Sequence, residues 1–499
     1  MSGESEHEGK TTLRRVGLFC IAFGSGFAVL TIEIAGARLI APVFGLSAVP
    51  WTAVIGVILA ALALGNHLGG RMADAGRVPL SRILFAAGLS GALPVLGAGL
   101  PWLARDVFGF IPGAVVSSLV LFAPPVLCLG AVVPYLVQAD TESLGSVGRR
   151  AGDISAAATA GSIMGTFLTG FVLLPAMPLP VLLGVTAAAL IVMAWASARL
   201  LNDDLGAGVA AVAALGLGGL GALASGLPAD TLYARQTLYS SVEITERTWS
   251  GGRLVRELWQ NGGSSSAEFT DTGEPAHAYA RVSMELLDPV MDRVDRVLVL
   301  GGAALSLPVA LHDRRPGILV DVVEIDPVVT RLAGEYFEYG STDRPGIEVV
   351  HDDVRVFLRG ADDAYDVVYL DVFDHLLTVP WTMVTTEALS DMAARLAPNG
   401  IFVANVLSPQ SGSGTRFLER FRATLNEVFG ETRVYTTDPE TAAGATQNMI
   451  VMAAMDASDL PEADRAETTV QPRGRPLTDM WAPVEYLQAR VLAGGFRWN

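Results

Sequence analysis

Apolar residues are concentrated in the first 227 positions, where they form long runs separated by short polar connections. A helix needs about 20 apolar residues to cross the core of a bilayer. After a cytoplasmic tail over residues 1–15, the pattern predicts an all-α transmembrane bundle over 16–227 with about seven spans. The seven predicted spans are 16–40, 51–72, 80–103, 111–138, 153–175, 178–200 and 206–227.

The second half of the chain has a different pattern. Short β-like runs on either side of Asn261-Gly-Gly predict a small antiparallel subdomain over 228–290. From 291 to 455, β-rich runs alternate with helical patterns, which predicts a doubly wound, mainly parallel sheet. The tail from 456 to 499 is expected to close on this domain. The predicted strands are 296–300, 319–325, 347–350, 366–370, 401–406 and 448–453.

The most informative motif is the first βαβ unit of this predicted sheet. The apolar run from Val297 stops at Gly301-Gly302, and the next run ends in Glu324 about 20 residues later, a spacing typical of nucleoside-binding units. We expect the two glycines to let a ligand approach the backbone closely and Glu324 to accept both ribose hydroxyls. Asp353, at the third strand end, is expected to accept a hydrogen bond from an adenine amino group.

Two further acids, Asp371 and Asp374, follow the fourth predicted strand. Two carboxylates there could bind a cationic amine and take its proton, since an amine must be neutral to attack carbon. A glycine turn alone is a weak signal, whereas the ordered set of turn and acids is more specific. The alternative for each acid is a helix N-cap or a solvated turn. We expect the four acids to line one crevice.

Charge divides the chain in the same way as hydrophobicity. Residues 1–227 carry equal numbers of basic and acidic residues, so the net charge of −17 falls on 228–499. An acidic field favours small cations and argues against nucleic acid, although solubility is an equally simple explanation. The only cysteines, Cys20 and Cys128, lie in apolar spans, which excludes a disulfide framework and a thiolate zinc site. The only lysine is Lys10, which excludes Schiff-base chemistry in the second half.

The arginines between the predicted spans indicate the orientation of the bundle. They lie mainly in the even-numbered connections, so the positive-inside rule puts the N-terminus in the cytoplasm. Seven spans would then place the second half outside the cell, whereas a nucleoside made in the cytosol requires it inside. The sequence leaves this conflict open. The arginines concerned are Arg71, Arg77, Arg82, Arg149, Arg150 and Arg199.

The glycine turn with its ordered acids resembles the spermidine synthase (polyamine aminopropyltransferase) family. More closely, the chain is similar to membrane-fused spermidine synthase-like proteins of bacteria, and this resemblance spans nearly the whole chain. The resemblance implies a Rossmann-like, class I methyltransferase-like C-terminal domain. Outside the acids it rests on Gly26–Glu33, Arg38, Pro42–Gly45, Leu64–Asp74, Gly161–Gly165, Leu477–Asp479 and Ala482–Val484.

The resemblance also implies an activity. Decarboxylated S-adenosylmethionine would donate its aminopropyl group to putrescine or a related amine, with release of methylthioadenosine and without a metal. Glu324 would hold the ribose and Asp353 the adenine, Asp371 would be the base, and Asp374 would bind amine. Tyr239 would lie near the active site and act with Asp371, while His277 and Tyr279 would lie on the substrate side. We expect the chain to lie in the bilayer of a bacterial plasma membrane and to assemble as a homodimer.

The sequence departs from the family at several of these positions. Ala304 stands where the family has an aspartate that contacts the aminopropyl amine, and Ser265 falls about where it has a glutamine. The family's Tyr-His pair corresponds roughly to His277 and Ala278. Losing a charge-assisted hydrogen bond costs about 1.5–3 kcal/mol, which is tenfold or more in donor binding.

Two alternatives therefore stay open. An S-adenosylmethionine-dependent methyltransferase acting on a hydrophobic substrate would need no partner for an aminopropyl amine. A polyamine-sensing transporter is the other, motivated by Glu33, Arg38 and His67 within the spans. The simpler explanation of these three residues is that they fix helix packing.

Overall fold

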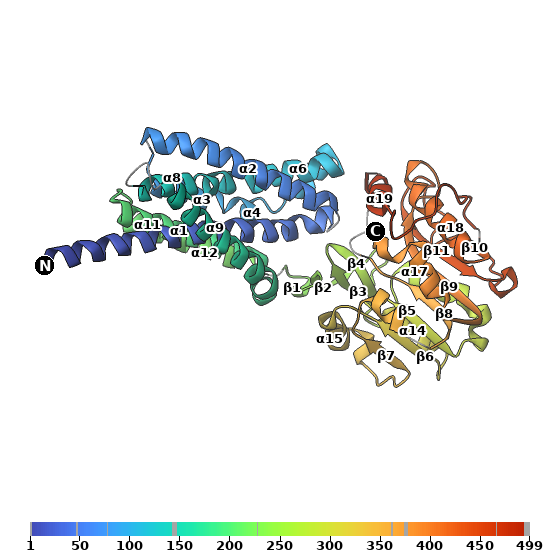
Figure 1. Cartoon of the computed structure of the whole chain (residues 1–499). Coiled ribbons are helices and arrows are strands. Elements are labelled where there is room, and N and C mark those ends of the chain that lie inside the picture. The colour runs from blue at the N-terminus through green and yellow to red at the C-terminus, as the bar shows by residue number, and fades with distance from the viewer. Residues whose placement is uncertain are drawn as a thin grey trace. The chain divides into compact units, whose positions relative to one another are not determined.

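A computed structural model gives the fold of the chain. It describes residues 2–493 apart from 46–47, 77, 142–146, 227, 361–362, 374–377 and 466, and it describes no side chains for 2–11 and 489–493. The chain divides into two compact units, Met1–Gly226 and Leu227–Asn499. Figure 1 shows helices alone in the first unit and two sheets with helices in the second.

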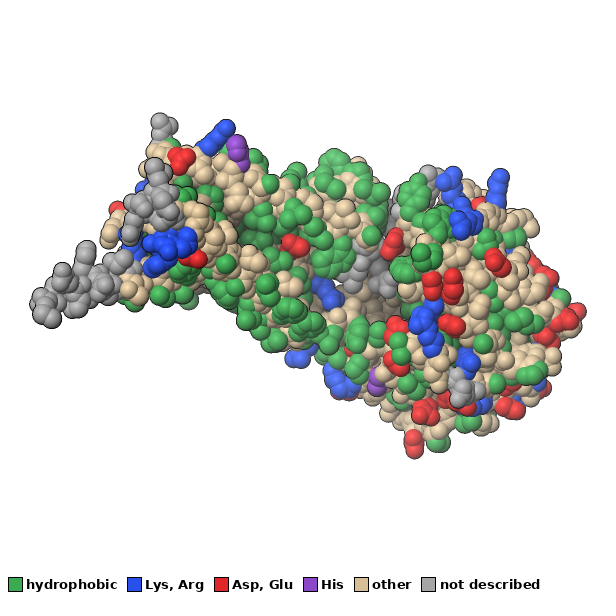
Figure 2. All heavy atoms as spheres, in the orientation of Figure 1, with side chains coloured by type: hydrophobic (Ala, Val, Ile, Leu, Met, Phe, Trp, Pro, Cys, Tyr) green, Lys and Arg blue, Asp and Glu red, His purple; other side chains and the backbone are tan. Residues whose placement is uncertain are grey.

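The first unit is a helical bundle. Its helices are α1 (Ser2–Phe44), α2 (Ala48–Ala75), α3 (Leu80–Ser90), α4 (Leu93–Leu96), α5 (Leu100–Phe108), α6 (Phe110–Leu121), α7 (Ala123–Gly130), α8 (Val132–Asp140), α9 (Val147–Leu168), the π-helix η2 (Thr169–Leu173), α10 (Leu174–Ala176), α11 (Leu179–Leu201) and α12 (Ala207–Ala224). Among the described residues, six helices are long and apolar enough to cross a membrane, or seven if a bent pair forms one span. Hydrophobic side chains cover much of the visible face of this unit in Figure 2.

Two of the predicted spans are not single straight helices. The span predicted over 80–103 is bent by 70° between Leu80–Leu96 and Leu100–Phe108. The span predicted over 111–138 is wrong as one helix, because Phe110–Leu121 is a separate short helix and the long segment is Ala123–Asp140. Prolines cause such breaks, since each removes a backbone donor from the helix interior.

Helices α1 and α9 pack at very short range. A Cβ added to Gly161 would lie 1.8 Å from the carbonyl oxygen of Phe23, and one added to Gly26 would lie 2.0 Å from that of Ala158. Thr31 of α1 and Thr169, the first residue of η2 directly after α9, share a buried hydrogen bond of 2.9 Å. Small residues with buried hydroxyls are the usual means by which membrane helices approach closely. Small residues around Gly161 therefore form a close-packing face against α1.

This contact gives a first testable result. Gly161→Ala is expected to destabilise the bundle by about 1–3 kcal/mol, because the two helix backbones would have to separate. Gly152→Ala is the matched control on the same helix, since its Cβ would meet nothing within 4 Å. Thermal unfolding in detergent should show a lower midpoint for Gly161→Ala alone. Equal midpoints for the two variants would contradict the packing.

The second unit contains two sheets. The small antiparallel sheet has the order β1-β2-β3-β4, and the larger one has the order β10-β11-β9-β8-β5-β6-β7. The strands are β1 (Thr231–Gln236), β2 (Ser241–Thr248), β3 (Leu254–Gln260), β4 (Gly263–Phe269), β5 (Arg296–Leu300), β6 (Leu319–Val323), β7 (Ile347–Val350), β8 (Tyr365–Leu370), β9 (Leu396–Ser408), β10 (Glu431–Thr436) and β11 (Gln447–Ala454). Strands β7, β6, β5, β8 and β9 run parallel.

The predicted fold class is confirmed, with one difference at an edge. Strand β10 was not predicted, and both β10 and β11 run antiparallel to their neighbours, so the larger sheet is mixed. Antiparallel edge strands are common on otherwise parallel sheets. The run Glu431–Thr436 alternates only weakly between apolar and polar residues, which is why the sequence pattern did not reveal it.

Helices cover both faces of the larger sheet. They are α13 (Ala278–Leu287), η3 (Asp288–Arg293), α14 (Ser306–Arg314), α15 (Pro327–Tyr336), η4 (Glu338–Gly340), α16 (Val354–Gly360), η5 (Trp381–Met383), α17 (Thr386–Ala393), η6 (Ser413–Thr415), α18 (Arg416–Val428), η7 (Ala457–Asp459) and α19 (Val484–Ala493). Along β5, Val297 and Val299 join the core with α13 and α14, whereas Leu298 and Leu300 join the core with α16, α17 and α18. Coverage on both faces explains the nearly continuous apolar run of β5.

A third core joins the small sheet to the larger domain. Val242, Ile244 and Leu258 of the small sheet pack against Val329 and Leu332 of α15. In addition, Arg256 of β3 donates a hydrogen bond to the backbone carbonyl of Tyr336 in α15. The small sheet is therefore held next to the segment that follows β5 and β6, where the candidate site lies.

Candidate functional site

The strand ends β8, β5, β6 and β7 are level with one another. The Asp371 amide donates to Leu300 O at 2.9 Å, the Gly301 amide to Val323 O at 2.9 Å, and the Glu324 amide to Val350 O at 3.0 Å. These bonds continue the parallel ladder by one residue. In such sheets ligands bind beyond the carboxyl ends of the strands, so the candidate site is built from the residues that follow.

The glycine loop follows β5 directly. Gly301 has φ +96°, and a Cβ there would lie 2.4 Å from the carbonyl oxygen of Asp371. A Cβ on Gly302 would lie 2.9 Å from Val322 Cγ1. Ala303 and Leu305 also have positive φ, at 45° and 62°. The loop is therefore a tight turn in which Gly301 permits contact between the backbones of two strand ends.

Glu324 lies against this loop. Its Oε2 accepts hydrogen bonds of 3.1 Å from the amides of Gly302 and Ala303, and its Oε1 accepts one of 2.9 Å from the Asp326 amide. Burial raises the pKa of Glu324, while the three amide donors oppose that shift. A carboxylate has about four acceptor positions, so one remains for a hydroxyl without any change in the loop.

Asp326 ties the small sheet to this edge, a role that our sequence analysis missed. Its Oδ2 accepts a hydrogen bond of 2.6 Å from the Thr237 hydroxyl, and its Oδ1 accepts one of 3.0 Å from the Val328 amide at the start of α15. The Thr237 hydroxyl in turn accepts from the Tyr239 amide at 3.1 Å. Tyr239 thus lies in a turn that is hydrogen-bonded to Asp326, which follows Glu324 by two residues. The side chain of Tyr239 is exposed. The Asp-Pro pair before a helix was the available signal.

Asp371 lies at the end of β8 in a polar cluster. Asn405 of β9 donates a hydrogen bond of 3.0 Å to its Oδ1, and the Tyr279 hydroxyl also hydrogen-bonds to it. Burial raises the pKa of Asp371 to about 6, although these two hydrogen bonds act in the opposite direction. A carboxyl with such a pKa can exchange a proton near neutral pH, which is the property that a general base requires.

His277 and Tyr279 form an aromatic wall beside Asp371. Their rings stack with centroids 5.8 Å apart, and Trp249 lies 5.7 Å from His277. Burial lowers the pKa of His277 to about 4, so the ring is neutral at pH 7. Its Nε2 lies 3.0 Å from the Ser264 hydroxyl, which also donates to the buried Glu257 at 3.0 Å. The wall is therefore uncharged, and the hydrogen bond between His277 and Ser264 of β4 attaches it to the small sheet.

Asp353 is exposed at the end of β7 and caps helix α16. Its Oδ1 accepts hydrogen bonds of 2.9 Å from the Arg355 amide and 3.2 Å from the Val356 amide. Asp353 is therefore an N-cap, the alternative that the sequence allowed. That its remaining acceptor positions accept a hydrogen bond from the adenine amino group stays a prediction. Asp374 lies outside the described residues.

Ala304 does not face the polar cluster. It is fully buried and packs with Val242, Ile244 and Leu258 of the small sheet and with Leu332 of α15. Its amide donates a hydrogen bond of 3.2 Å to the Ser266 hydroxyl. In this chain, position 304 therefore joins the glycine loop to the small sheet by apolar contact.

This burial predicts the effect of restoring a carboxylate. Ala304→Asp is expected to destabilise the second unit by about 2–4 kcal/mol, because a carboxyl would enter an apolar cluster. Ala303→Asn is the control, since this position is only half-buried and its φ of +45° suits asparagine. Thermal unfolding of both variants measures the difference. A fully stable Ala304→Asp protein with tighter donor binding would contradict the packing at this position.

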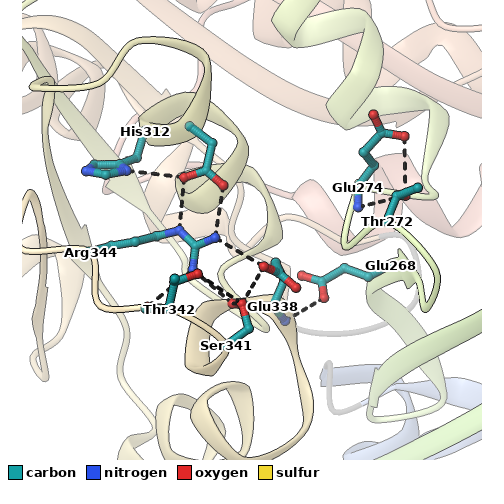
Figure 3. A network of polar contacts seen from close by, with 9 residues as sticks. Glu268, Thr272, Glu274, His312, Glu338, Ser341, Thr342 and Arg344 are labelled. Atoms are coloured by element: carbon teal, nitrogen blue, oxygen red, sulfur yellow. Dashed lines mark hydrogen bonds and ion pairs between the residues drawn. The ribbon is translucent and has the colours of Figure 1, made fainter.

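A network of acidic residues around Arg344, where β4 meets η4, is drawn in Figure 3. Glu268 of β4 accepts a hydrogen bond of 2.8 Å from the Glu338 amide, and burial raises the pKa of its carboxyl to about 7. Arg344 holds Glu338 and also pairs with Asp313 at 2.9 Å. These contacts fasten β4 to η4 and to α14, so they stabilise the small sheet in its position.

Of the predicted site residues, Gly301, Gly302, Glu324 and Asp371 gather around adjacent strand ends, and Tyr279 and His277 flank Asp371. Asp353 lies one strand further along and Tyr239 on the turn beside Asp326. Within the described part of the chain, no group of three or more His, Cys, Asp and Glu side chains is arranged to hold a metal ion.

Comparisons with known proteins show what the chain is similar to. The chain is 29% identical over 170 residues to a polyamine aminopropyltransferase of Vibrio vulnificus, covering 33% of this chain and 54% of that protein. It is 34% identical over 193 residues to one of Mycobacterium tuberculosis, covering 37% and 34%. The chain thus spans about half or less of the length of these relatives. No family model matches the chain.

A third relative extends the similarity into the helical unit. The chain is 27% identical over 411 residues to polyamine aminopropyltransferase 1 of Streptomyces coelicolor, covering 76% of this chain and 73% of that protein. That alignment is longer than the second unit. The human eEF1A lysine and N-terminal methyltransferase is 30% identical over 125 residues, or 23% of this chain and 18% of that protein.

Solved structures include a probable spermidine synthase from Corynebacterium glutamicum, with a TM-score of 0.41 and 21% identity, covering 52% of this chain and 100% of that one. The relatives show that this chain is similar to polyamine aminopropyltransferases.

Proposed function

We propose that the chain is a membrane-bound aminopropyltransferase that uses decarboxylated S-adenosylmethionine and a diamine such as putrescine. The observation that carries this proposal is the carboxyl of Asp371, whose pKa is raised to about 6 by burial and which lies beside the glycine loop. A base with that pKa next to a nucleoside-type turn suits proton removal from an amine during alkyl transfer. The named relatives support the same class of reaction.

The donor would bind at the glycine loop. Gly301 and Gly302 permit the tight turn after β5, and Glu324 has one acceptor position left for a ribose hydroxyl. Asp353 would accept from the adenine amino group through an oxygen position that its capping bonds do not use. These residues fit a nucleoside whose nucleobase is uncharged. The step proposed below needs no metal.

The acceptor amine would lie beside Asp371. Asp371 takes one proton from the ammonium, and the freed nitrogen lone pair attacks the carbon next to the sulfonium. The C–N bond forms as the C–S bond breaks, and the bonding electrons go to sulfur, which leaves as a neutral thioether. The protein supplies position and a base, and the uncharged wall of His277 and Tyr279 would limit water at the nitrogen. Asp374 would bind the amine, and Tyr239 would act with Asp371.

The pKa of Asp371 predicts a pH dependence. The base is active only when ionised, so kcat/KM should fall as the pH drops through about 6 and should level off above it. The profile is measured between about pH 5 and pH 8 with saturating donor. An acidic limb near pH 4, the range of an unperturbed aspartate, would show that Asp371 is not the titrating group.

For the helical unit, we propose that it anchors the enzyme in a bacterial plasma membrane with the N-terminus in the cytoplasm. The support is the set of six described helices long enough to cross a bilayer and the arginines of the even-numbered connections. Asn66 and His67 are exposed on α2, which gives little support to a polar conduit through these residues. Protease accessibility of tagged termini in sealed vesicles would test the orientation.

A methyltransferase is the second candidate, and Ala304 favours it. The glycine loop presents no carboxylate at this position, so an aminopropyl amine lacks one partner there. Calorimetry with the whole protein separates the two candidates. The first predicts tighter binding of decarboxylated S-adenosylmethionine than of S-adenosylmethionine. The reverse order, with methyl transfer to a membrane extract, would establish the second.

A further inference from the structure

We propose that Asn405 and Asn448 form a positioning pair that orients Asp371 and keeps it ionised for proton removal. This inference rests on the proposed function of Asp371 as a base. Neither asparagine drew attention in the sequence, because they are distant from the glycine turn and from the acids in the chain. The structure brings both to the carboxyl edge of the sheet.

Strand register explains why the three side chains meet. In the parallel pair β8–β9, Leu370 lies opposite Ala404, so Asp371 is level with Asn405. In the antiparallel pair β9–β11, Asn405 lies opposite Ile450, and Asn448 is two residues before Ile450 on the same face. Diagonal neighbours of this kind are within reach of an amide side chain. The arrangement is therefore fixed by backbone pairing.

The hydrogen bonds of the pair run in one direction. Asn448 Nδ2 donates to Asn405 Oδ1 at 2.9 Å, and Asn405 Nδ2 donates to Asp371 Oδ1 at 3.0 Å. Asn405 Oδ1 accepts the hydrogen bond from Asn448 Nδ2. If the Asn405 amide were rotated by 180°, its NH2 group would face the NH2 group of Asn448, and two donors would meet without an acceptor. Asn448 thus sets the orientation of Asn405, and Asn405 presents an N–H to Asp371. Only an ionised or correctly rotated carboxyl accepts at that position.

Burial of Asn405 strengthens the hydrogen bonds of the pair. Asn405 is 2% exposed and Asn448 is half-buried. The backbone carbonyl of Asn448 accepts hydrogen bonds of 3.3 and 3.0 Å from the amide and hydroxyl of Thr437, which fixes the backbone that carries this side chain. A hydrogen bond to a charged group counts for more where water is excluded. In the described residues around Asp371, the titratable groups are the phenols of Tyr279 and Tyr369 and the imidazole of His277, which stacks on Tyr279. Burial raises the pKa of each phenol and lowers the pKa of His277 to about 4. All three groups are therefore neutral at pH 7, and none supplies the positive charge that would otherwise hold Asp371 ionised.

The asparagine pair affects proton transfer from the amine to Asp371. With Asn405 on one acceptor position of Asp371, the remaining positions are free for the proton of the amine. Loss of the pair would leave the half-buried carboxyl of Asp371 with fewer donors, which favours its neutral form. A neutral Asp371 cannot accept the proton, so the pH range of activity should move upward.

The test compares Asn405→Ala and Asn448→Ala with the unaltered full chain. In Asn405→Ala, we expect the acidic limb of kcat/KM to move up by about one pH unit or more, with kcat falling further than KM rises. In Asn448→Ala, we expect a smaller shift in the same direction, because Asn405 keeps its N–H but loses its fixed orientation. The pH dependence of the donor and amine is common to all variants and cancels in the comparison.

A control separates positioning from general stability. Asn426 accepts a hydrogen bond of 2.7 Å from the Thr432 hydroxyl in the same unit, away from the site. Asn426→Ala should lower the melting temperature without moving the acidic limb. Acidic limbs that stay in place in both Asn405→Ala and Asn448→Ala would overturn the positioning role, whatever their melting temperatures.

A second measurement needs no turnover. Infrared difference spectra of the full chain against Asp371→Asn follow protonation of this carboxyl directly as pH is changed. The midpoint should rise in Asn405→Ala and in Asn448→Ala, and an unchanged midpoint would refute the pair. If the protein transfers no alkyl group at all, the proposed function fails, while the infrared midpoints still decide whether the asparagines hold Asp371.

Discussion

Asp371→Asn is expected to lower kcat for alkyl transfer by about 10²-fold or more while leaving donor binding nearly unchanged. Asparagine has the same shape, so the bond from Asn405 and the position of β8 can persist, but the side chain can no longer take a proton. Steady-state kinetics with calorimetry of donor binding measures both parts. The loss should be in kcat, since the donor lies on the glycine-loop side of the site.

Asp288→Asn is the matched control. Asp288 is an exposed carboxylate in the same unit that pairs with Arg314 at 2.6 Å, and surface pairs of this kind contribute about 0–1 kcal/mol. It should retain full activity. If Asp371→Asn retained activity within a few fold of the unaltered chain, Asp371 would not be the base and the amine would lose its proton elsewhere.

Gly301→Ala should have the largest effect on stability. Its Cβ would lie 2.4 Å from the carbonyl oxygen of Asp371, and its φ of +96° is a conformation that alanine rarely adopts. We expect a loss of at least about 3 kcal/mol in the free energy of unfolding, from backbone strain and forced separation of β5 and β8. Donor binding should fall as well, because the same backbone forms the turn.

Gly334→Ala provides the comparison within the same domain. Gly334 lies inside α15, and an added Cβ would meet nothing within 4 Å. Alanine in a helix interior stabilises by about 0.5–1 kcal/mol relative to glycine. Chemical denaturation of the two variants should therefore give shifts of opposite sign. A Gly301→Ala protein as stable as Gly334→Ala would show that the loop is not as tight as described.

The core of the site could be predicted from the sequence because its signals are local. The glycine turn after an apolar run and the acid at the end of the next run fix Gly301, Gly302 and Glu324 at neighbouring strand ends. Asp371 follows by the same argument one strand away. Parallel strands pack with their carboxyl ends together, so strand order alone brings these residues to one edge.

Residues that depend on long-range register could not be predicted in this way. Asn405 and Asn448 meet Asp371 only through the pairing of three strands, and Thr237 reaches Asp326 from another sheet. A single asparagine or threonine in a sequence gives no sign of such a partner. Strand β10 was missed for a related reason, since an edge strand needs little alternation of apolar residues.

Position 304 has a packing role that the sequence did not reveal. From the sequence, Ala304 indicated a missing contact to the donor, because the family has an aspartate there. In the structure it joins the glycine loop to the small sheet through apolar packing. The small sheet therefore carries part of the stability of the loop, and its polar links to Asp326 and Glu338 do the same.

Product analysis by mass spectrometry is the most direct test of the central claim. The full chain is incubated with a diamine and either decarboxylated S-adenosylmethionine or S-adenosylmethionine. The account predicts a triamine heavier by one aminopropyl group, with one molecule of methylthioadenosine released for each, from the decarboxylated donor only. Methylated product from S-adenosylmethionine, or no thioether nucleoside from either donor, would contradict it.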